Sequence, residues 1–408
     1  MKIKFIIPVV GLALISSSCG LSSSSVKSVA STSETKLYDT LGNEITSGNA
    51  NVSFVYGKQT TTKTIQAKYL IDGVNVTIEE GDFESSSSSE NEVVFLVVNG
   101  GSLTIEGTST NYVNIVKSGS EASSGQVDDD YNFYGINSGI VVSGSTSKAN
   151  IKYANIVTSS NGSNAVVATN NSEITIANSA IATSGSTGSR GLHTTYGGNI
   201  DASETSIVTK GVSCATLAND RGGGTITATN MTLETNSNGS PLVYSTDSIS
   251  VSSSTGVSNN AQMVVVEGGS SATLEDCDFS CTGKGNRTGT SEINTSSHTI
   301  DEGGIFIYQS FSGDSSVGID YFKATNCSFN VTSEDVPMFY LTNITADISL
   351  NGNTFTQASS SDYLLVAEST DQWGNSSSNG ATVSLTLSNQ DWDENKTFVG
   401  AISSITYK

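Results

Sequence analysis

A repeat of about 25 residues runs through most of the chain and limits the fold more than any other feature. Each unit has an apolar anchor residue at the same point, namely Ile156, Ile181, Ile207, Leu233, Phe279, Phe329 and Phe355. The anchors are spaced by 25, 26, 26, 46, 50 and 26 residues, and we expect the interval of 46 to hold two short units with an intermediate anchor near Val257. Repetition at such a period is typical of solenoids.

Within each unit, an alternating pattern precedes the anchor. The positions seven and five residues before it are apolar: Ala149, Ile174, Ile200, Ile226, Ala272, Phe322 and Ile348, then Ile151, Ile176, Ala202, Ala228, Leu274, Ala324 and Leu350. The position between them is polar: Asn150, Thr175, Asp201, Thr227, Thr273, Lys323 and Ser349. This alternation predicts a short strand with one apolar face. Such a face can be buried only if the next unit stacks on it in parallel.

A turn and a second strand complete the predicted unit. Polar residues that favour turns stand three residues before the anchor, at Asn178, Glu204, Asn230, Asp276 and Asn326. A second apolar segment begins the units, as at 165–168, 263–266, 305–308 and 338–341. We therefore predict an all-β fold, a single-stranded right-handed parallel β-helix (solenoid). An antiparallel β-sandwich is the rival, but it predicts no matched rows across many units.

Composition and charge limit the classes of fold and of binding partner that are expected. Only 14% of residues are charged and 3 are proline, so neither a helix-rich fold nor a proline-rich linker is expected. The net charge of −21 with 18 basic residues argues against a nucleic-acid partner. Polyanions such as pectin would also be repelled unless calcium bridged them to the protein, whereas neutral glycans or basic protein surfaces would not be. We expect no cofactor, with calcium as the alternative.

The N-terminal residues predict export. Residues 1–15 have a basic start and an apolar core that is short for a membrane span, which is typical of a signal peptide. Residues 16–20 (SSSCG) resemble a bacterial lipobox, although Ser16 stands where that pattern usually has Leu or Val. We expect an export signal at 1–19, lipid attachment at Cys19 and a Ser-rich tether at 20–50, which gives a cell-surface lipoprotein. The alternative is a cleaved, freely secreted protein.

The β-helix is expected over 51–408, with an N-terminal cap at 51–83 and insertions near 120–135 and 282–303. The first insertion carries an acidic run beside aromatic residues: Asp128, Asp129, Asp130, Tyr131 and Tyr134. We consider it a candidate calcium or sugar loop, or else a plain solvated loop, since adjacent aspartates do not match EF-hand spacing. The insertions start about six coils apart, roughly 29 Å at about 4.8 Å per strand, so we do not expect one active site between them.

A row of turn residues gives the candidate binding site. Tyr196 and Gly222 both lie eleven residues before an anchor, so we expect Tyr196 to meet Asp220 and Arg221 on the neighbouring coil. Asp247 and Glu267 should lie further along that row. The alternative is a charge-paired turn stack without a ligand. We assign no catalytic residue, because neither histidine, His193 or His298, lies in a nucleophile-elbow context.

Cys277 and Cys327 share one predicted row on adjacent coils. We expect them to be small inward-facing side chains, with a disulfide as the alternative because strand spacing falls within the usual Cα–Cα range.

Three segments, 191–200 (GLHTTYGGNI), 219–224 (NDRGGG) and 307–314 (IYQSFSGD), carry a family resemblance. They resemble right-handed parallel β-helix bacterial surface proteins with a pectate-lyase-like architecture, many of them adhesin-like or carbohydrate-binding. At the level of repeats the likeness spans about 51–397. It implies the fold, but it carries no catalytic residues to this chain.

The resulting functional hypothesis is a non-enzymatic, adhesin-like surface lipoprotein. We expect it to be a monomer that binds carbohydrate or a host-surface protein through the polar face of the β-helix. It would meet the membrane only through its lipid anchor. Two alternatives stay open: a calcium-assisted polysaccharide lyase or glycoside hydrolase that uses the acidic and basic turn cluster, and a structural cell-surface spacer with no ligand.

Overall fold

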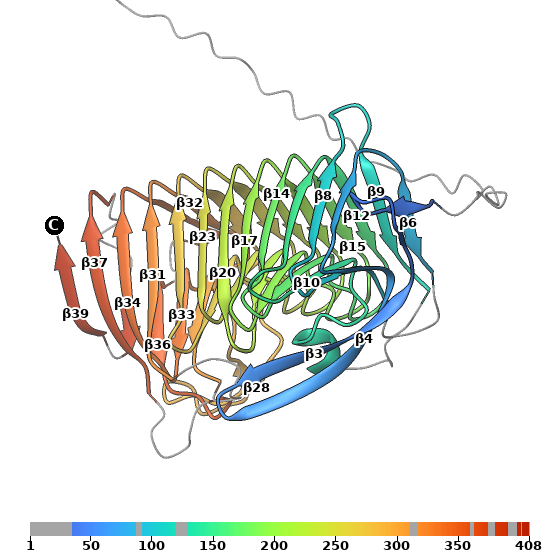
Figure 1. Ribbon diagram of the computed structural model, residues 1–408. Coiled ribbons are helices and arrows are strands. Elements are labelled where there is room, and N and C mark those ends of the chain that lie inside the picture. Colours follow the sequence, from blue (N-terminus) through green and yellow to red (C-terminus); the bar gives the residue numbers. More distant parts are fainter. Residues whose placement is uncertain are drawn as a thin grey trace, which may run out of the picture. The chain divides into compact units, whose positions relative to one another are not determined.

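The computed structural model describes residues 35–86, 92–119, 129–310, 317–359, 363–373, 380–390, 398–400 and 402–407. Residues 36–408 form one unit of stacked coils (Figure 1). The expected export signal, Cys19 and most of the expected tether lie outside the described residues. The structured unit begins before residue 51, because β1 (Leu37–Tyr38) and β2 (Glu44–Ile45) pair as an antiparallel hairpin. In the described part of the chain, no helix has the length and apolar character needed to cross a membrane.

Most coils pass through three long sheets in turn (Figure 1). Sheet A has 13 strands: β3 (Gly48–Tyr56), β4 (Gln59–Asp72), β7 (Glu92–Val98), β10 (Ile140–Ser143), β13 (Val166–Thr169), β16 (Leu192–Thr195), β19 (Leu217–Asn219), β22 (Val243–Ser245), β25 (Val264–Glu267), β30 (Ile305–Tyr308), β33 (Phe339–Thr342), β36 (Leu365–Glu368) and β38 (Phe398–Gly400).

Sheet B has 12 strands: β5 (Asn75–Ile78), β8 (Ser102–Glu106), β11 (Lys148–Lys152), β14 (Glu173–Ala177), β17 (Gly198–Ser203), β20 (Gly224–Thr229), β23 (Ser248–Ser252), β26 (Ser271–Glu275), β31 (Ile319–Thr325), β34 (Thr345–Asn351), β37 (Thr382–Ser388) and β39 (Ile402–Tyr407).

Sheet C has 10 strands: β6 (Asp82–Ser85), β9 (Val113–Lys117), β12 (Ala154–Thr158), β15 (Ala180–Thr183), β18 (Ser206–Thr209), β21 (Thr232–Thr235), β24 (Thr255–Ser258), β27 (Asp278–Cys281), β32 (Ser328–Val331) and β35 (Thr354–Gln357). Apart from the antiparallel β3–β4 pair, the strands described in these sheets pair in parallel. The predicted all-β parallel β-helix is therefore confirmed.

The predicted register is also confirmed in detail, with one error. Ile156 pairs with Ile181 in sheet C, and Phe279 pairs with Phe329. The interval of 46 residues holds two coils, as predicted, but the anchor position lies one residue before Val257: the anchor row passes through Gly256, and Val257 is 43% exposed. A Cβ on Gly256 would lie 2.5 Å from Leu242 and 3.1 Å from the Phe279 ring, so these large neighbours fill the space that an anchor side chain would occupy.

The turn between sheets B and C has the expected polar residues in the left-handed conformation. Asn178, Glu204, Asn230, Asp276 and Asn326 have φ between 50 and 55°. Asparagine and aspartate tolerate this region better than most residues, which explains their recurrence.

Cys277 and Cys327 follow this turn on neighbouring coils. Both thiols are free and buried, as expected of inward-facing side chains. The Cys277 N–H donates to Cys327 Sγ at 3.5 Å.

The outward face of sheet A is covered by other segments. The β3–β4 hairpin, here called the arm, does not only cap the coils: it extends along their flank (Figure 1), and Asn170 Nδ2 donates to Ser53 O at 3.1 Å. Beside it lies the first insertion, described from α1 (Asp129–Asn132) onward. The second insertion, at 282–304, contains the β28 (Thr288–Gly289) and β29 (His298–Thr299) pair. Because β25 pairs directly with β30, the 50-residue interval adds loops and no extra coil.

Candidate functional site

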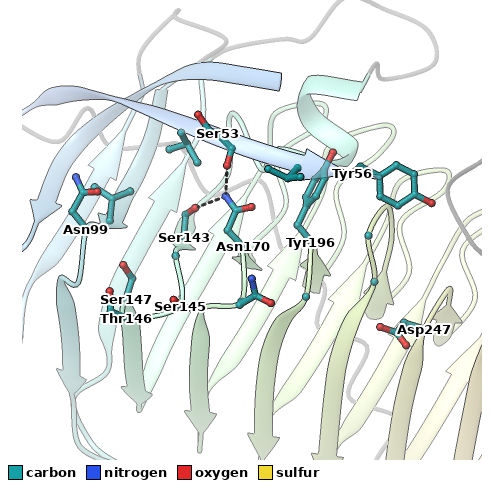
Figure 2. A pocket seen from close by; sticks show the side chains of 18 of the residues that line it. Ser53, Tyr56, Asn99, Ser143, Ser145, Thr146, Ser147, Asn170, Tyr196 and Asp247 are labelled. Carbon is teal, nitrogen blue, oxygen red and sulfur yellow. Dashed lines mark hydrogen bonds between the residues drawn. The ribbon is translucent and has the colours of Figure 1, made fainter. Parts of the chain in front are cut away.

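A polar groove of about 840 Å³ lies between the arm and the turns that connect sheet A to sheet B (Figure 2). It is lined by Asn51, Val52, Ser53, Val55, Tyr56, Val98, Asn99, Ser143, Gly144, Ser145, Thr146, Ser147, Asn170, Asn171, Tyr196, Gly197, Gly222, Gly223, Thr246, Asp247 and Gly269. These turns belong to successive coils from β7 to β25, six steps apart, so the groove follows the coil axis for about 29 Å.

Turn chemistry explains the polar floor of the groove. Asn99, Asn170 and Asn171 have φ of 53, 53 and 60°, where an amide side chain is favoured over most alternatives. Asn170 Nδ2 donates to Ser143 Oγ at 3.0 Å as well as to Ser53 O, and it thereby joins the arm to the floor (Figure 2). The repeated left-handed turn thus places amides and hydroxyls along one line.

The groove is almost uncharged. Asp247 is the one ionisable acidic or basic side chain among its lining residues, in a chain of net charge −21. Its Oδ2 accepts the N–H of Gly224 at 2.9 Å, and the side chain is otherwise exposed. The net negative charge of the protein would repel an anionic ligand, whereas an uncharged ligand in this groove meets no such repulsion.

Tyr196 closes one side of the groove. Its ring stacks on Tyr134 with centroids 6.0 Å apart and lies 5.1 Å from Phe54 of the arm. Gly222 fits beneath it on the next coil, since a Cβ there would lie 3.0 Å from Tyr196 Cα. Burial, and then hydrogen bonding to Tyr134, raise the pKa of Tyr196, so the phenol is neutral near pH 7. Its N–H donates to Arg221 O at 3.0 Å, which brings these two residues together as the sequence predicted.

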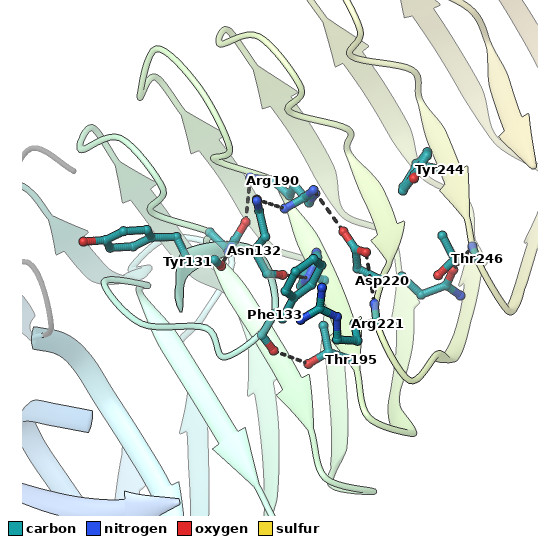
Figure 3. A network of polar contacts seen from close by, with 12 residues as sticks. Tyr131, Asn132, Phe133, Arg190, Thr195, Asp220, Arg221, Tyr244 and Thr246 are labelled. Atoms are coloured by element: carbon teal, nitrogen blue, oxygen red, sulfur yellow. Dashed lines mark hydrogen bonds and ion pairs between the residues drawn. The ribbon is translucent and has the colours of Figure 1, made fainter. Parts of the chain in front are cut away.

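Asp220 faces away from the groove, in a buried network (Figure 3). Arg190 donates to Asp220 Oδ2 at 3.1 Å and to Asn132 Oδ1 at 3.0 Å, and Arg190 and Asp220 are only 8% and 5% exposed. Burial lowers the pKa of His193, so its neutral ring donates from Nε2 to Asn132 O at 2.9 Å. This network attaches the first insertion to sheet A.

The acidic run of the first insertion makes ion pairs. Asp129 Oδ2 lies 3.0 Å from Nη1 of Arg221, whose guanidinium also lies 3.8 Å from the Phe133 ring centroid, and Asp130 pairs with Lys63 (Figure 3 shows Arg221 beside Phe133). Tyr131 and Tyr134 are buried. Asp128 lies outside the described residues. Within the described ranges, no three His, Cys, Asp or Glu residues gather in a way that could hold a metal ion.

Glu267 lies in a different environment from Tyr196. It is 2% exposed and accepts hydrogen bonds from the hydroxyls of Tyr244, Tyr308 and Ser310, with Tyr308 Oη 2.6 Å away. Of the five residues expected in one row, the structure therefore places Tyr196 and Asp247 in the groove, Arg221 beside it, and Asp220 and Glu267 in buried networks.

Sequence reasoning missed the amides and hydroxyls of the groove. The repeat was aligned on anchors in sheet C, so the turns that hold Asn99, Asn170 and Asn171 were not recognised as one row. The repeat also gave no sign that the arm lies over these turns. The available signal was the pair Asn170-Asn171 directly after a buried strand, where turns with positive φ are common.

No protein-family model, curated protein or solved structure matches this chain. The groove and its surroundings are therefore the basis for a functional proposal.

Proposed function

We propose that the solenoid binds a neutral, hydroxyl-rich polymer, a surface glycan, along the groove. The observation that carries this proposal is the lining itself, which is long, rich in amides and hydroxyls, and has one acidic side chain, Asp247. Amide and hydroxyl groups can each donate and accept hydrogen bonds, as the hydroxyls of a sugar do. The net charge of −21 disfavours a polyanion in the same place.

The aromatic residues of the groove support the same ligand class. Tyr56 is 37% exposed on the arm, and its ring lies edge-on to Tyr196 with centroids 6.5 Å apart. A partly exposed phenol offers an apolar face with a polar tip, which suits the apolar face and hydroxyl rim of a sugar ring. Because the groove crosses several coils, it suits a chain of sugars better than a single small molecule.

The proposed setting is the cell surface. Export by residues 1–19, lipid attachment at Cys19 and the Ser-rich tether would present the solenoid at a distance from the membrane. Adhesin-like binding without catalysis is part of the proposal, by analogy with the pectate-lyase-like surface proteins that the chain resembles. A host-surface protein that carries glycans would be an equally suitable partner.

The contacts of Arg221 favour a binding function over calcium-assisted lysis or hydrolysis. An arginine that removes a proton from a sugar would need access to the substrate. Here its guanidinium is ion-paired with Asp129 and covers the Phe133 ring. These contacts give it a structural role that attaches the first insertion.

The test is binding of the purified protein to a panel of neutral and anionic polysaccharides, measured by calorimetry. Asn171→Gly removes an exposed amide but keeps a residue that accepts φ of 60°, and Tyr56→Ala removes the aromatic face. Each should weaken binding to a neutral polymer about three- to tenfold, the range expected for one hydrogen bond or aromatic contact. Thr232→Ala, on the exposed face of sheet C, is the matched control and should have no effect.

Binding restricted to anionic polymers, or binding to which both groove variants are indifferent, would contradict the proposal. A folded protein that binds nothing in the panel would instead support the structural-spacer alternative.

A further inference from the structure

The outward face of sheet A has a gap between its two covers. Along its centre, strand pairing brings ten residues into one row: Leu96, Val141, Val167, His193, Ala218, Tyr244, Val265, Phe306, Tyr340 and Val366. The arm and the first insertion cover the N-terminal end of this row, and the second insertion approaches it near Tyr340, where a Cβ on Gly303 would lie 2.9 Å from Tyr340 Cβ. Between them, beside Tyr244 and Val265, is a cavity of about 230 Å³.

The coils and the second insertion line this cavity. Arg190, which binds Asn132 of the first insertion, lines it on one side. Asn286, Arg287 and Asp301 of the second insertion line it on the other. Arg190 is thus bonded to the first insertion and lines the same cavity as residues of the second, although the described part of the first insertion itself contributes no lining residue. None of the lining residues is shared with the polar groove.

One wall of the cavity is aromatic. The Phe306 and Tyr308 rings stack with centroids 4.6 Å apart, and the Trp373 ring centroid lies 5.5 Å from Phe306 and 5.0 Å from Tyr308. The hydroxyls of Tyr244 and Tyr308 are directed to Glu267. These bonds fix the two rings, so the wall is preformed and little conformational entropy is lost when a ligand stacks on it.

The opposite edge is polar and carries both charges. Asp301 is 7% exposed, and its carboxylate accepts the N–H groups of Asn286 and Arg287 at 3.1 and 3.0 Å. The carboxylate oxygens have further lone pairs available. The Arg287 side chain is exposed, and its guanidinium makes no hydrogen bond or ion pair with the part of the chain that the structure describes. A carboxylate acceptor and a guanidinium donor thus face an aromatic wall.

We propose that this cavity is a second binding site, which holds one neutral sugar ring at the end of a glycan chain. The ring would stack on Trp373, which is partly exposed and lies beside Tyr308, while Asp301 and Arg287 would bind its hydroxyls. The opposite charges of Asp301 and Arg287 favour neither an anion nor a cation, so a neutral ligand is expected. The cavity volume is below the roughly 300 Å³ at which sites for drug-sized ligands begin, so a single ring is expected. The ligand class is that of the proposed function, but the site uses none of the groove residues.

Saturation-transfer NMR with methyl glycosides of neutral hexoses and N-acetylhexosamines tests this site. Trp373→Asn removes the indole but suits the φ of 54° at this position, and we expect it to abolish the transfer. Arg287→Ala should weaken binding about tenfold, as expected for loss of a charge-assisted hydrogen bond. Lys284→Ala removes a positive charge from the same insertion outside the cavity lining and should leave binding unchanged.

The outcomes separate the two sites. The groove variants Asn171→Gly and Tyr56→Ala should bind the monosaccharides as the parent does, so failure of the groove proposal would not mimic failure of this one. The inference is overturned if no neutral glycoside receives saturation from the folded protein, if only uronates do, or if folded Trp373→Asn and Arg287→Ala bind as well as Lys284→Ala.

Discussion

The outward faces of sheets A and B have the same backbone geometry and opposite surroundings. On sheet B the outward row of Asn150, Thr175, Asp201, Thr227, Ser250, Thr273, Lys323 and Ser349 is polar and largely exposed. On sheet A the corresponding row is largely apolar and lies under the arm and the two insertions. Each coil therefore has one face that the coils alone complete and one that needs added segments.

Binding sites in such a solenoid can therefore form on one face more readily than on the other. A stack of regular strands gives a flat surface, and the outward face of sheet B offers shallow sites at most. Segments that cross sheet A create concave sites at their margins: the polar groove beside the arm and the aromatic cavity beside the second insertion. Concave sites are also where ligands usually bind.

The largest effect should come from a charge placed beneath a cover. Val167 is fully buried in sheet A next to Gly135 of the first insertion. Val167→Asp should lower the free energy of unfolding by about 4 kcal/mol, because the carboxylate would be buried without a partner. Asn150→Asp, on the exposed face of sheet B and paired with Thr104 and Thr175, should change it by less than about 0.5 kcal/mol. Urea unfolding followed by circular dichroism compares the two, and equal losses would remove the distinction between the faces.

The second largest effect should be a difference in stability between alanine variants of the two arginines under the first insertion. Arg190→Ala leaves Asp220 buried without its ion pair and should cost about 3 kcal/mol. Arg221→Ala breaks a pair with Asp129, which is 61% exposed, and should cost about 1 kcal/mol, mainly through lost contact with the Phe133 ring. Thermal unfolding measures both. A larger loss for Arg221→Ala would show that the insertion is held chiefly from its exposed edge.

The stability of the protein should depend on pH through Asp320, which lies in β31 of sheet B. Burial raises the pKa of this carboxyl to about 7 from 3.8, with Glu267 nearby, so the folded state binds the proton more tightly than the unfolded state. Its contribution to stability is therefore lost as the pH rises from about 4 to 7, by up to about 1.4 kcal/mol per pH unit. Asp320→Asn should gain stability relative to the parent over that range, as measured by melting temperature from pH 4.5 to 8. A constant difference between the two proteins would contradict the assignment.

The smallest effect is expected on the exposed face of sheet B. Asp201→Thr and Lys323→Thr should each alter stability by less than about 0.5 kcal/mol, since both side chains are exposed. Neither should change binding to a neutral polysaccharide, because neither lines the groove. If calorimetry showed loss of binding in either variant, the flat polar face would be the ligand surface after all.

Sequence reasoning predicted the coils better than it predicted the sites. The rows through Ala149 and Ile151 were read with the correct inward direction, because a period of two leaves each row one face to occupy. Gly256 was missed because an anchor position normally holds an apolar side chain, and only packing shows that Leu242 and Phe279 occupy its place. Asp220 and Arg221 are neighbours in sequence, yet one is buried with Arg190 and the other lies at the surface with Asp129.

The parallel coils follow from the repeat alone, since stacking is the one way to bury the apolar face of every repeated strand. The repeat also predicts most of the polar turns, because Asn and Asp accept left-handed backbone angles more readily than most residues, although Glu204 occupies the same turn position. The positions of the arm and the insertions across sheet A, in contrast, follow from long-range packing. Their contacts join residues far apart in the chain, such as Asn170 with Ser53 and Arg190 with Asn132, and no repeat encodes those distances.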